Sequence, residues 1–207
     1  MIIAVDGPTA SGKGTIAKAL AAHFGLPHLD TGLVYRAVGW QCLRNGGDPD
    51  NESDALAACT FPDELLAYPE LRSEVAGGLA SRVSVHPGVR AALYERQSAF
   101  AMQPGGAVLD GRDIGTVIAP EAEVKLFVVA SVPMRAERRH REMLETGRAT
   151  ALAAIEAELA ARDRRDASRA AAPLRQAADA ILLDTTALGR DAAIAAAIAA
   201  VEAAQKR

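Results

Sequence analysis

The fold of this chain is constrained most by nine consecutive residues near its amino terminus, Gly7-Pro8-Thr9-Ala10-Ser11-Gly12-Lys13-Gly14-Thr15. They follow the short apolar run 2–5, which reads as a buried strand, and they precede an amphipathic stretch that reads as a helix. A strand, a glycine-rich loop and a helix in this order are the context of a Walker A loop. The glycines let successive amides point inward, and Lys13 can reach outer phosphates. We therefore expect all nine residues to contact a nucleoside triphosphate.

The loop departs from the strict Walker A pattern at one position. That pattern has serine or threonine directly after the lysine, whereas here Gly14 intervenes and Thr15 follows. The Gly-Lys-Gly-Thr variant resembles the loop of nucleoside monophosphate kinases, in which a metal contact by the threonine is less expected. We therefore expect no direct protein ligand for a metal, and we expect Mg²⁺ to be held by phosphates and water.

Four short apolar runs, residues 2–5, 107–109, 124–129 and 181–183, each precede a stretch that reads as helix. This alternation predicts an α/β fold with a parallel sheet of about five strands flanked by helices. The runs are continuous rather than alternating, so both faces of the sheet should be covered. With 207 residues, half of them apolar, the chain should form a single domain, 1–207.

Three helices can be outlined from apolar residues spaced one turn apart. The first should end at Gly25, the second should run from Thr31 to residues 45–47, and the third should lie near the carboxyl terminus. The residues expected to face the core are Ile16, Leu20 and Phe24 in the first helix, Val34 and Val38 in the second, and Ile194, Ile198 and Val201 in the last. Residues 48–104 and 135–169 fit the sheet poorly and are expected to form flaps.

The overall charge excludes some partners. A net charge of −3 offers no general attraction to nucleic acid or to anionic membranes. The apolar stretch 192–201 is too short to span a bilayer, which takes about 20 helical residues. Cys42 and Cys59 form neither a disulfide framework nor a CxxC motif. We therefore expect a cytoplasmic monomer with small-molecule ligands, no nucleic acid and no membrane association.

Three further segments could bind an anion. Thr31 is expected at a helix N-cap with Arg36 just over one turn on, although a capped helix with a surface arginine explains the pattern equally well. Residues 110–113, Asp-Gly-Arg-Asp, follow a buried strand, where ligand crevices open in parallel sheets. Residues 162–169 alternate in charge and could also be a solvated helix face.

Taken together and in order, these segments resemble bacterial cytidylate kinases over nearly the whole chain. The resemblance implies transfer of the γ-phosphoryl group of ATP, with Mg²⁺, to CMP or dCMP to give ADP and CDP or dCDP. It implies a P-loop kinase core, a monophosphate-binding region at about 31–104 and an arginine-rich lid at about 135–169. The strands that often extend the monophosphate region have no counterpart in 54–82, so this insert is expected to be shortened.

The resemblance also implies roles for individual residues. ATP would contact the loop together with Arg138 and Arg139, while Arg135, Arg141 and Arg148 of the same charged stretch are unranked candidates. The acceptor nucleotide would contact Thr31, Arg36, Ser81, Arg90, Asp110, Arg112, Asp113, Arg162, Asp166 and Arg169. The catalytic residues would be Lys13, Arg112 and Arg169, which offset charge on the phosphates.

Asp113 would identify the base of the acceptor nucleotide. An acidic side chain can accept from the exocyclic amine of cytosine, where uracil presents an acceptor instead. By resemblance, Ser81 and Arg90 would donate to the other side of the ring, although by local pattern both read as ordinary helix-surface residues. Arg162 and Asp166, one helical turn apart, would bind the sugar.

Two other functions remain open from the sequence alone. Another small-molecule kinase, such as a shikimate, gluconate or dephospho-coenzyme A kinase, would use Asp30 on a hydroxyl acceptor. A nucleotide-dependent switch is the alternative from a different class, but the chain has no Asn-Lys-x-Asp sequence. The four histidines are scattered and form no evident general base, which favours a phosphate acceptor that is already ionised near pH 7.

Overall fold

The computed structural model describes residues 1–145, 147 and 150–206. Arg148, one of the lid candidates, lies outside the described residues. The chain divides into two compact units. The first, here the sheet unit, comprises Met1–Leu29 and Gln103–Arg207, and the second, here the helical unit, comprises Asp30–Met102.

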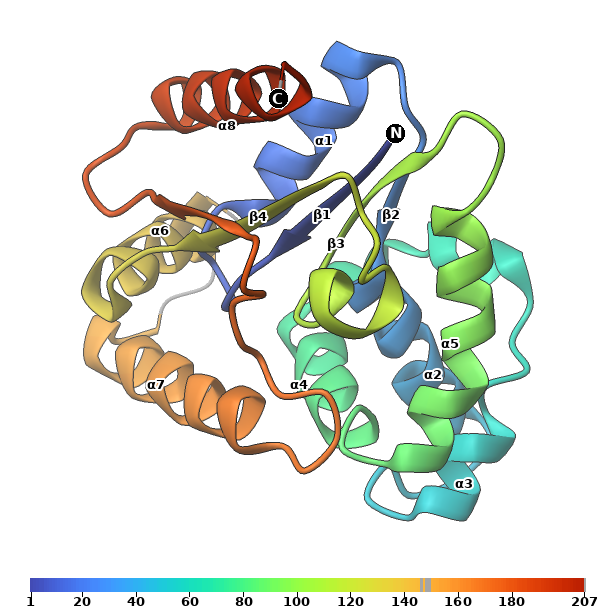
Figure 1. The fold of residues 1–207 in the computed structure, drawn as a ribbon. Coiled ribbons are helices and arrows are strands. Elements are labelled where there is room, and N and C mark those ends of the chain that lie inside the picture. The colour runs from blue at the N-terminus through green and yellow to red at the C-terminus, as the bar shows by residue number, and fades with distance from the viewer. Residues whose placement is uncertain (146, 148–149, 207) are drawn as a thin grey trace. The chain divides into compact units, whose positions relative to one another are not determined.

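The strands form one five-stranded sheet in the order β2-β3-β1-β4-β5, which confirms the predicted α/β class (Figure 1). Their bounds are β1 Ile2–Asp6, β2 His28–Asp30, β3 Ala107–Gly111, β4 Val124–Val129 and β5 Ile181–Asp184. β1 pairs in parallel with both β3 and β4, and β4 pairs in parallel with β5. Because β1 is central, the loop that follows Asp6 leaves the middle of the sheet.

The short strand β2 has no equivalent among the apolar runs of the sequence. Its three residues are all half-buried, so it shows neither a continuous apolar run nor a clear alternation. The edge strand β5 is also unusual, because Ile181 and Leu182 are exposed although the continuous apolar run 181–183 predicts a strand that is buried on both faces. Apolarity alone therefore places the central strands better than the edges of this sheet.

Helices α1 (Lys13–Phe24) and α8 (Arg190–Gln205) lie side by side and share one apolar core with the sheet (Figure 1). The first helix ends at Gly25, as expected from its sequence. In α8 the expected stripe is confirmed at two of three positions: Val201 is buried, and the half-buried Ile198 packs against the core. Ile194 is half-buried and does not belong to this core, whereas the smaller Ala193 and Ala197 do. Alanine at these two positions allows α8 to approach the core closely.

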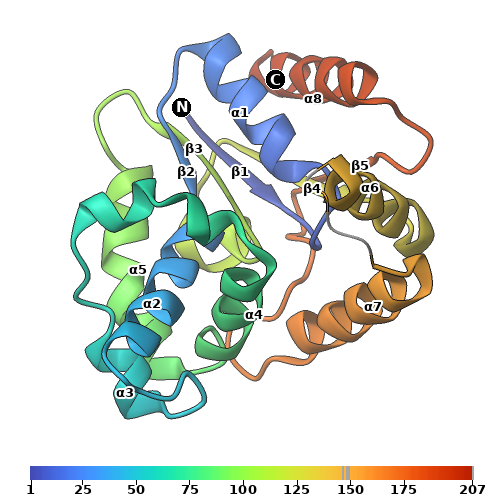
Figure 2. The same cartoon turned by 180° about the vertical axis from the view of Figure 1, so that it is seen from behind.

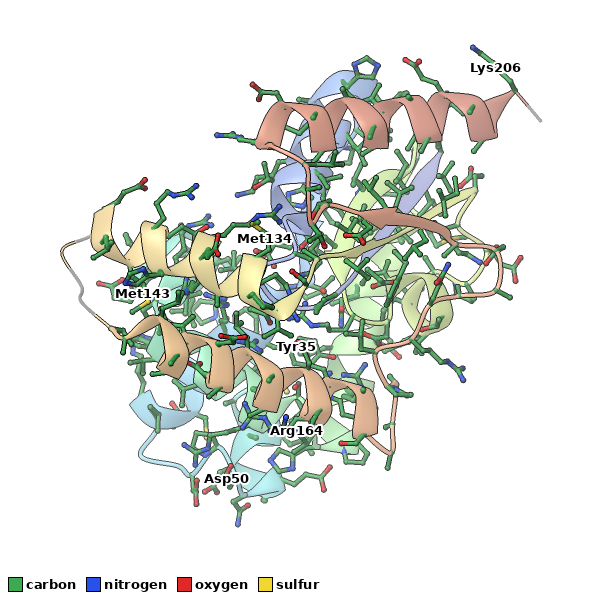
Figure 3. All side chains as sticks on the ribbon, turned by 90° about the vertical axis from the view of Figure 1, so that its left-hand side faces the viewer. Tyr35, Asp50, Met134, Met143, Arg164 and Lys206 are labelled. Atoms are coloured by element: carbon green, nitrogen blue, oxygen red, sulfur yellow. The ribbon has the colours of Figure 1, made fainter. Side chains whose placement is uncertain are left out.

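The charged stretch of the sheet unit forms two helices, α6 (Val132–Glu145) and α7 (Leu152–Ser168), which pack against each other (Figure 3). Their contact is a small apolar cluster of Ala136, Met143, Ile155 and Leu159. The sheet unit also contains η3 (Ile114–Ile118), a π-helical turn directly after Asp113.

The helical unit contains α2 (Thr31–Arg44), α3 (Glu52–Ala57), η1 (Asp63–Ala67), η2 (Pro69–Arg72), α4 (Glu74–Val83) and α5 (Pro87–Ala101). All of 31–102 is described, and the elements assigned within it are helical, so the region lacks inserted strands as expected. Helices α2 and α4 pack closely (Figure 2). A Cβ on Gly39 would lie 2.6 Å from the Cβ of Leu79, so this contact requires glycine.

Candidate active site

The loop from Gly7 to Thr15 joins β1 to α1 with a backbone that few residues can adopt. At Gly7 a Cβ would lie 2.1 Å from the backbone oxygen of Val128, so a side chain is excluded. Ala10 has φ 61°, and Gly12, the N-cap of α1, has φ 91°; both are left-handed values. Glycine at the N-cap provides no side chain to cap the helix, so amides at the start of α1 are left for another acceptor.

The polar groups of the loop are suited to bind an anionic ligand. Lys13 begins α1, and its Nζ lies 3.4 Å from the backbone oxygen of Pro8. The hydroxyl of Ser11 is buried, and the described residues provide no hydrogen-bond partner for it. A positive helix end, a lysine and an unsatisfied hydroxyl suit a polyphosphate.

A buried carboxylate ties the strand before the loop to the segment that contains Asp113. The two oxygens of Asp6 accept from the backbone N–H groups of Ile114 at 2.9 Å and Gly115 at 2.8 Å. Burial raises the pKa of Asp6 to about 7, against the opposing effect of these two hydrogen bonds. Asp113 is 6% exposed and directly precedes the turn that Asp6 holds.

A second network links Arg112 to α7 and to the loop. Arg112 donates through Nε to Asp166 at 2.8 Å and through a terminal nitrogen to the hydroxyl of Thr9 at 2.6 Å. Arg169 donates to the other oxygen of Asp166. Burial opposes ionisation of Asp166, but Arg112, Arg169 and Arg162 together hold its pKa below the usual range.

At Asp166 the solvated-face interpretation of residues 162–169 is therefore wrong. Its side chain is only 1% exposed and lies between two guanidinium groups. Arg164, labelled in Figure 3, and Arg165 are exposed on the same helix. The alternation of charge thus describes a helix with one buried carboxylate and an opposite, solvated side.

Arginines of α6 also contact the loop. Arg135 is 2% exposed and donates to the backbone oxygen of Thr9 at 3.1 Å and to both oxygens of Asp163, at 3.0 and 2.5 Å. Arg138 donates to the backbone oxygens of Thr185 and Leu188 at 2.6 and 3.2 Å.

The two α6 arginines predicted to bind ATP differ in setting. A terminal nitrogen of Arg138 lies 3.9 Å from the Cβ position of Gly12, so this arginine stands against the loop. Arg139 donates to Glu142 of its own helix at 3.3 Å. Arg138 therefore lies beside the phosphate loop, whereas the hydrogen bond described for Arg139 stays within α6. The sequence alone did not distinguish these two arginines.

Asp110, at the end of β3, also lies beside the loop. One oxygen pairs with Nε2 of His28 at 2.8 Å, and the other is 3.6 Å from the Cβ position of Gly14. The carboxylate is 4% exposed. Among the described residues, no three His, Cys, Asp or Glu side chains gather as they would around a protein-bound metal.

The remaining predicted residues belong to the helical unit. Thr31 is not the N-cap of α2: Asp30 caps the helix by accepting from the N–H of Leu33 at 3.1 Å, and Thr31 is the first helical residue, buried. The prediction failed because both residue types favour caps and the sequence does not say which one leaves the helix. Arg36 donates to the backbone oxygen of Leu71 at 2.8 Å.

Ser81 and Arg90 differ from the surface positions that the local pattern suggested. Ser81, on α4, is 7% exposed. Arg90, on α5, lies over the ring of Tyr35 with its guanidinium 5.7 Å from the centroid. Both side chains are therefore held within the helical unit rather than extended into solvent.

The structure thus brings Lys13, Arg112, Asp113, Asp166, Arg169 and Arg138 into the sheet unit with the loop, whereas Thr31, Arg36, Ser81 and Arg90 belong to the helical unit. The sequence analysis assigned no individual role to Asp6, His28 or Asp163. The signal for Asp6 was a charged residue at the end of an apolar strand, and Asp163 belonged to the alternating charges of 162–169. His28 had no distinguishing local pattern.

The chain is similar over nearly its whole length to known cytidylate kinases. A family model described as cytidylate kinase matches residues 3–203. A cytidylate kinase of Xanthobacter autotrophicus is 57% identical over 203 residues, 98% of this chain and 98% of that protein. One of Azorhizobium caulinodans is 53% identical over 205 residues, 99% and 100% of the two chains.

Among solved structures, an uncharacterized protein from Eubacterium ventriosum shares the fold, with a TM-score of 0.57 and 13% sequence identity. The structural match covers 100% of this chain and 99% of the Eubacterium chain. The described residues contain no helix that is long and apolar enough to cross a membrane. The family model and the two relatives confirm the resemblance drawn from the motifs, and this chain belongs to the cytidylate kinase family of ATP-dependent phosphotransferases.

Proposed function

We propose that this chain transfers the γ-phosphoryl group of ATP to CMP and dCMP. The observation that supports this most directly is the network in which Arg112 joins the hydroxyl of Thr9 in the phosphate loop to the buried carboxylate of Asp166. It holds a guanidinium beside the loop, where an acceptor phosphate must approach the γ-phosphate. Family membership supplies the acceptor class.

In the proposed reaction an oxygen of the CMP phosphate attacks the γ-phosphorus of ATP. A new phosphorus–oxygen bond forms, the bond from the γ-phosphorus to the bridging oxygen breaks, and ADP leaves. The attacking phosphate is mostly dianionic at pH 7, because its second pKa is about 6. No general base is needed, and the protein mainly has to align two anions and offset their repulsion.

The residues of the sheet unit suit that task. Lys13 and the amides that begin α1 would hold the donor phosphates, and Arg112 and Arg169 would hold the acceptor phosphate. Asp166 keeps both arginines in place, and because its pKa is lowered it stays ionised at neutral pH. We further propose that Arg138 and Arg139 bind ATP and that Arg162 with Asp166 binds the sugar.

Asp113 is proposed to read the base by accepting from the cytosine amine. Its backbone is fixed, because the next two amides are held by Asp6. The helical unit is assigned as the monophosphate-binding region, and its residues Thr31, Arg36, Ser81 and Arg90 are proposed to contact the acceptor nucleotide. Residues 135–169, α6 and α7, are assigned as the lid.

Mg²⁺ is proposed as the cofactor, bound to ATP. The ion neutralises phosphate charge and orients the phosphate chain. Asp110 is suited to accept from its waters, because its carboxylate lies beside Gly14 at the start of α1. We also propose a monomer located in the cytoplasm without nucleic-acid or membrane partners; the free thiols of Cys42 and Cys59 are compatible with a reducing compartment.

The assignment is tested by measuring ADP release with Mg-ATP over CMP, dCMP, UMP, AMP and shikimate. CMP and dCMP should be the best acceptors, and a reaction without acceptor reports ATP hydrolysis. Faster turnover of UMP or shikimate than of CMP would refute the assignment.

A further inference from the structure

Two arginines from different parts of the sheet unit meet at one loop residue, Thr9. Arg112, which follows β3, donates to its hydroxyl at 2.6 Å. Arg135, on α6, donates to its backbone oxygen at 3.1 Å. Thr9 itself is half-buried. It therefore joins the loop to two guanidinium groups by two different atoms.

Each of these arginines also pairs with a carboxylate of α7. Arg112 pairs with Asp166 at 2.8 Å, and Arg135 pairs with Asp163 through two hydrogen bonds. Residues three apart on a helix lie on the same face. The structure thus contains two parallel bridges from Thr9 to one face of α7, and both lie wholly within the sheet unit.

We propose that Thr9 is a positioning residue that couples occupancy of the donor site to the orientation of Arg112 at the acceptor site. This inference rests on the proposed function, because it takes Arg112 as the arginine that meets the acceptor phosphate. A nucleotide that orders the loop orders the Thr9 hydroxyl, and the hydroxyl in turn holds Arg112.

The chemistry of the hydroxyl suits this role. A hydroxyl accepts and donates at the same time, so it can take the Arg112 N–H while donating its own proton to a phosphate oxygen. Valine has nearly the same shape as threonine but offers neither function. The next residue, Ala10, is held at a left-handed φ of 61°, which leaves the direction of the Thr9 carbonyl toward Arg135 little freedom.

The test measures CMP affinity by titration calorimetry with and without an ATP analogue that carries a methylene group between its β- and γ-phosphates. In the wild type the analogue should tighten CMP binding, and CMP should tighten analogue binding by the same factor. Thr9→Val should reduce that factor by about tenfold, the effect expected for losing a hydrogen bond to a charged donor. Thr9→Ser should restore it.

Thr116→Val is the matched control, because the buried Thr116 hydroxyl has no partner among the residues the structure describes. Its coupling factor should equal that of the wild type. If Thr9→Val does not fold, as judged by circular dichroism, Thr9→Ala provides the same loss of hydroxyl.

Three results would overturn the inference: no coupling in the wild type, unchanged coupling in the variant without a hydroxyl, or CMP binding weakened equally with and without the analogue. None of these requires CMP phosphorylation to fail. If the wild type does not phosphorylate CMP at all, it is the proposed function that fails.

Discussion

Replacing Asp6 by asparagine should change how the stability of this protein responds to pH. The carboxylate is buried at the end of β1 and accepts from two backbone amides, one on each oxygen. Burial nevertheless raises its pKa to about 7. Asparagine has almost the same shape but does not titrate, so it removes the proton equilibrium while keeping the packing.

The sign of the effect follows from proton binding in the two states. An unfolded aspartate has a pKa of about 3.9. Between that value and about 7 the folded protein keeps a proton on Asp6 that the unfolded chain has lost. The contribution of Asp6 to the free energy of unfolding is therefore largest in acid and falls as pH rises. From pH 5 to pH 8 the fall is about 2.5 kcal/mol.

Urea unfolding of the wild type and of Asp6→Asn at pH 5 and pH 8 measures this difference. The free energy of unfolding of the wild type minus that of the variant should fall by about 2.5 kcal/mol between the two pH values. Asp191→Asn, which changes an exposed carboxylate on α8, is the control, and its difference from the wild type should be the same at both.

Parallel pH dependence of wild type and Asp6→Asn would refute the reasoning. It would mean that the two amides of Ile114 and Gly115 stabilise the carboxylate enough to cancel the cost of burial. If the free energy of unfolding of the wild type minus that of Asp6→Asn rises with pH, the pKa of Asp6 is lowered rather than raised in the folded protein.

Three more substitutions test the site. Lys13→Ala should leave the circular dichroism spectrum and melting temperature nearly unchanged but abolish most phosphoryl transfer in the ADP-release assay; wild-type rates would exclude a role for Lys13. Asp113→Ala should raise KM for CMP and narrow the ratio of CMP to UMP turnover while leaving KM for ATP unchanged; an unchanged ratio would contradict base recognition by Asp113. Asp166→Asn should destabilise the protein by about 3 kcal/mol in urea unfolding at pH 7, because it leaves two largely buried guanidinium groups without their charged partner. Since the pKa of Asp166 is lowered, that contribution is present above about pH 4 and is lost in stronger acid, so the two proteins should converge there.

Features encoded in neighbouring residues could be predicted from the sequence. The loop from Gly7 to Thr15, the end of α1 at Gly25 and the start of α2 at Thr31 depend on glycine, caps and short apolar repeats, which act within one or two turns. The family resemblance rested on the same kind of short motif and was confirmed.

Predictions failed where a choice depended on the approach of another element. The face that α8 turns to the core is set by how closely it packs, so Ala193 and Ala197 belong to the core and the larger Ile194 does not. The strand β2 is three residues long and was not identified, because its pairing rather than its composition makes it a strand.

The sequence by itself determined that this chain has a phosphate-binding loop between a buried strand and a helix, and which side chains could meet an anion. Only the tertiary structure decided which of those side chains are joined. Asp6 accepts from Ile114 across 108 residues of sequence, and Arg112 reaches Thr9 across 103. No local pattern specifies such pairs, because a hydrogen bond between distant residues exists only after the sheet has brought the ends of its strands together.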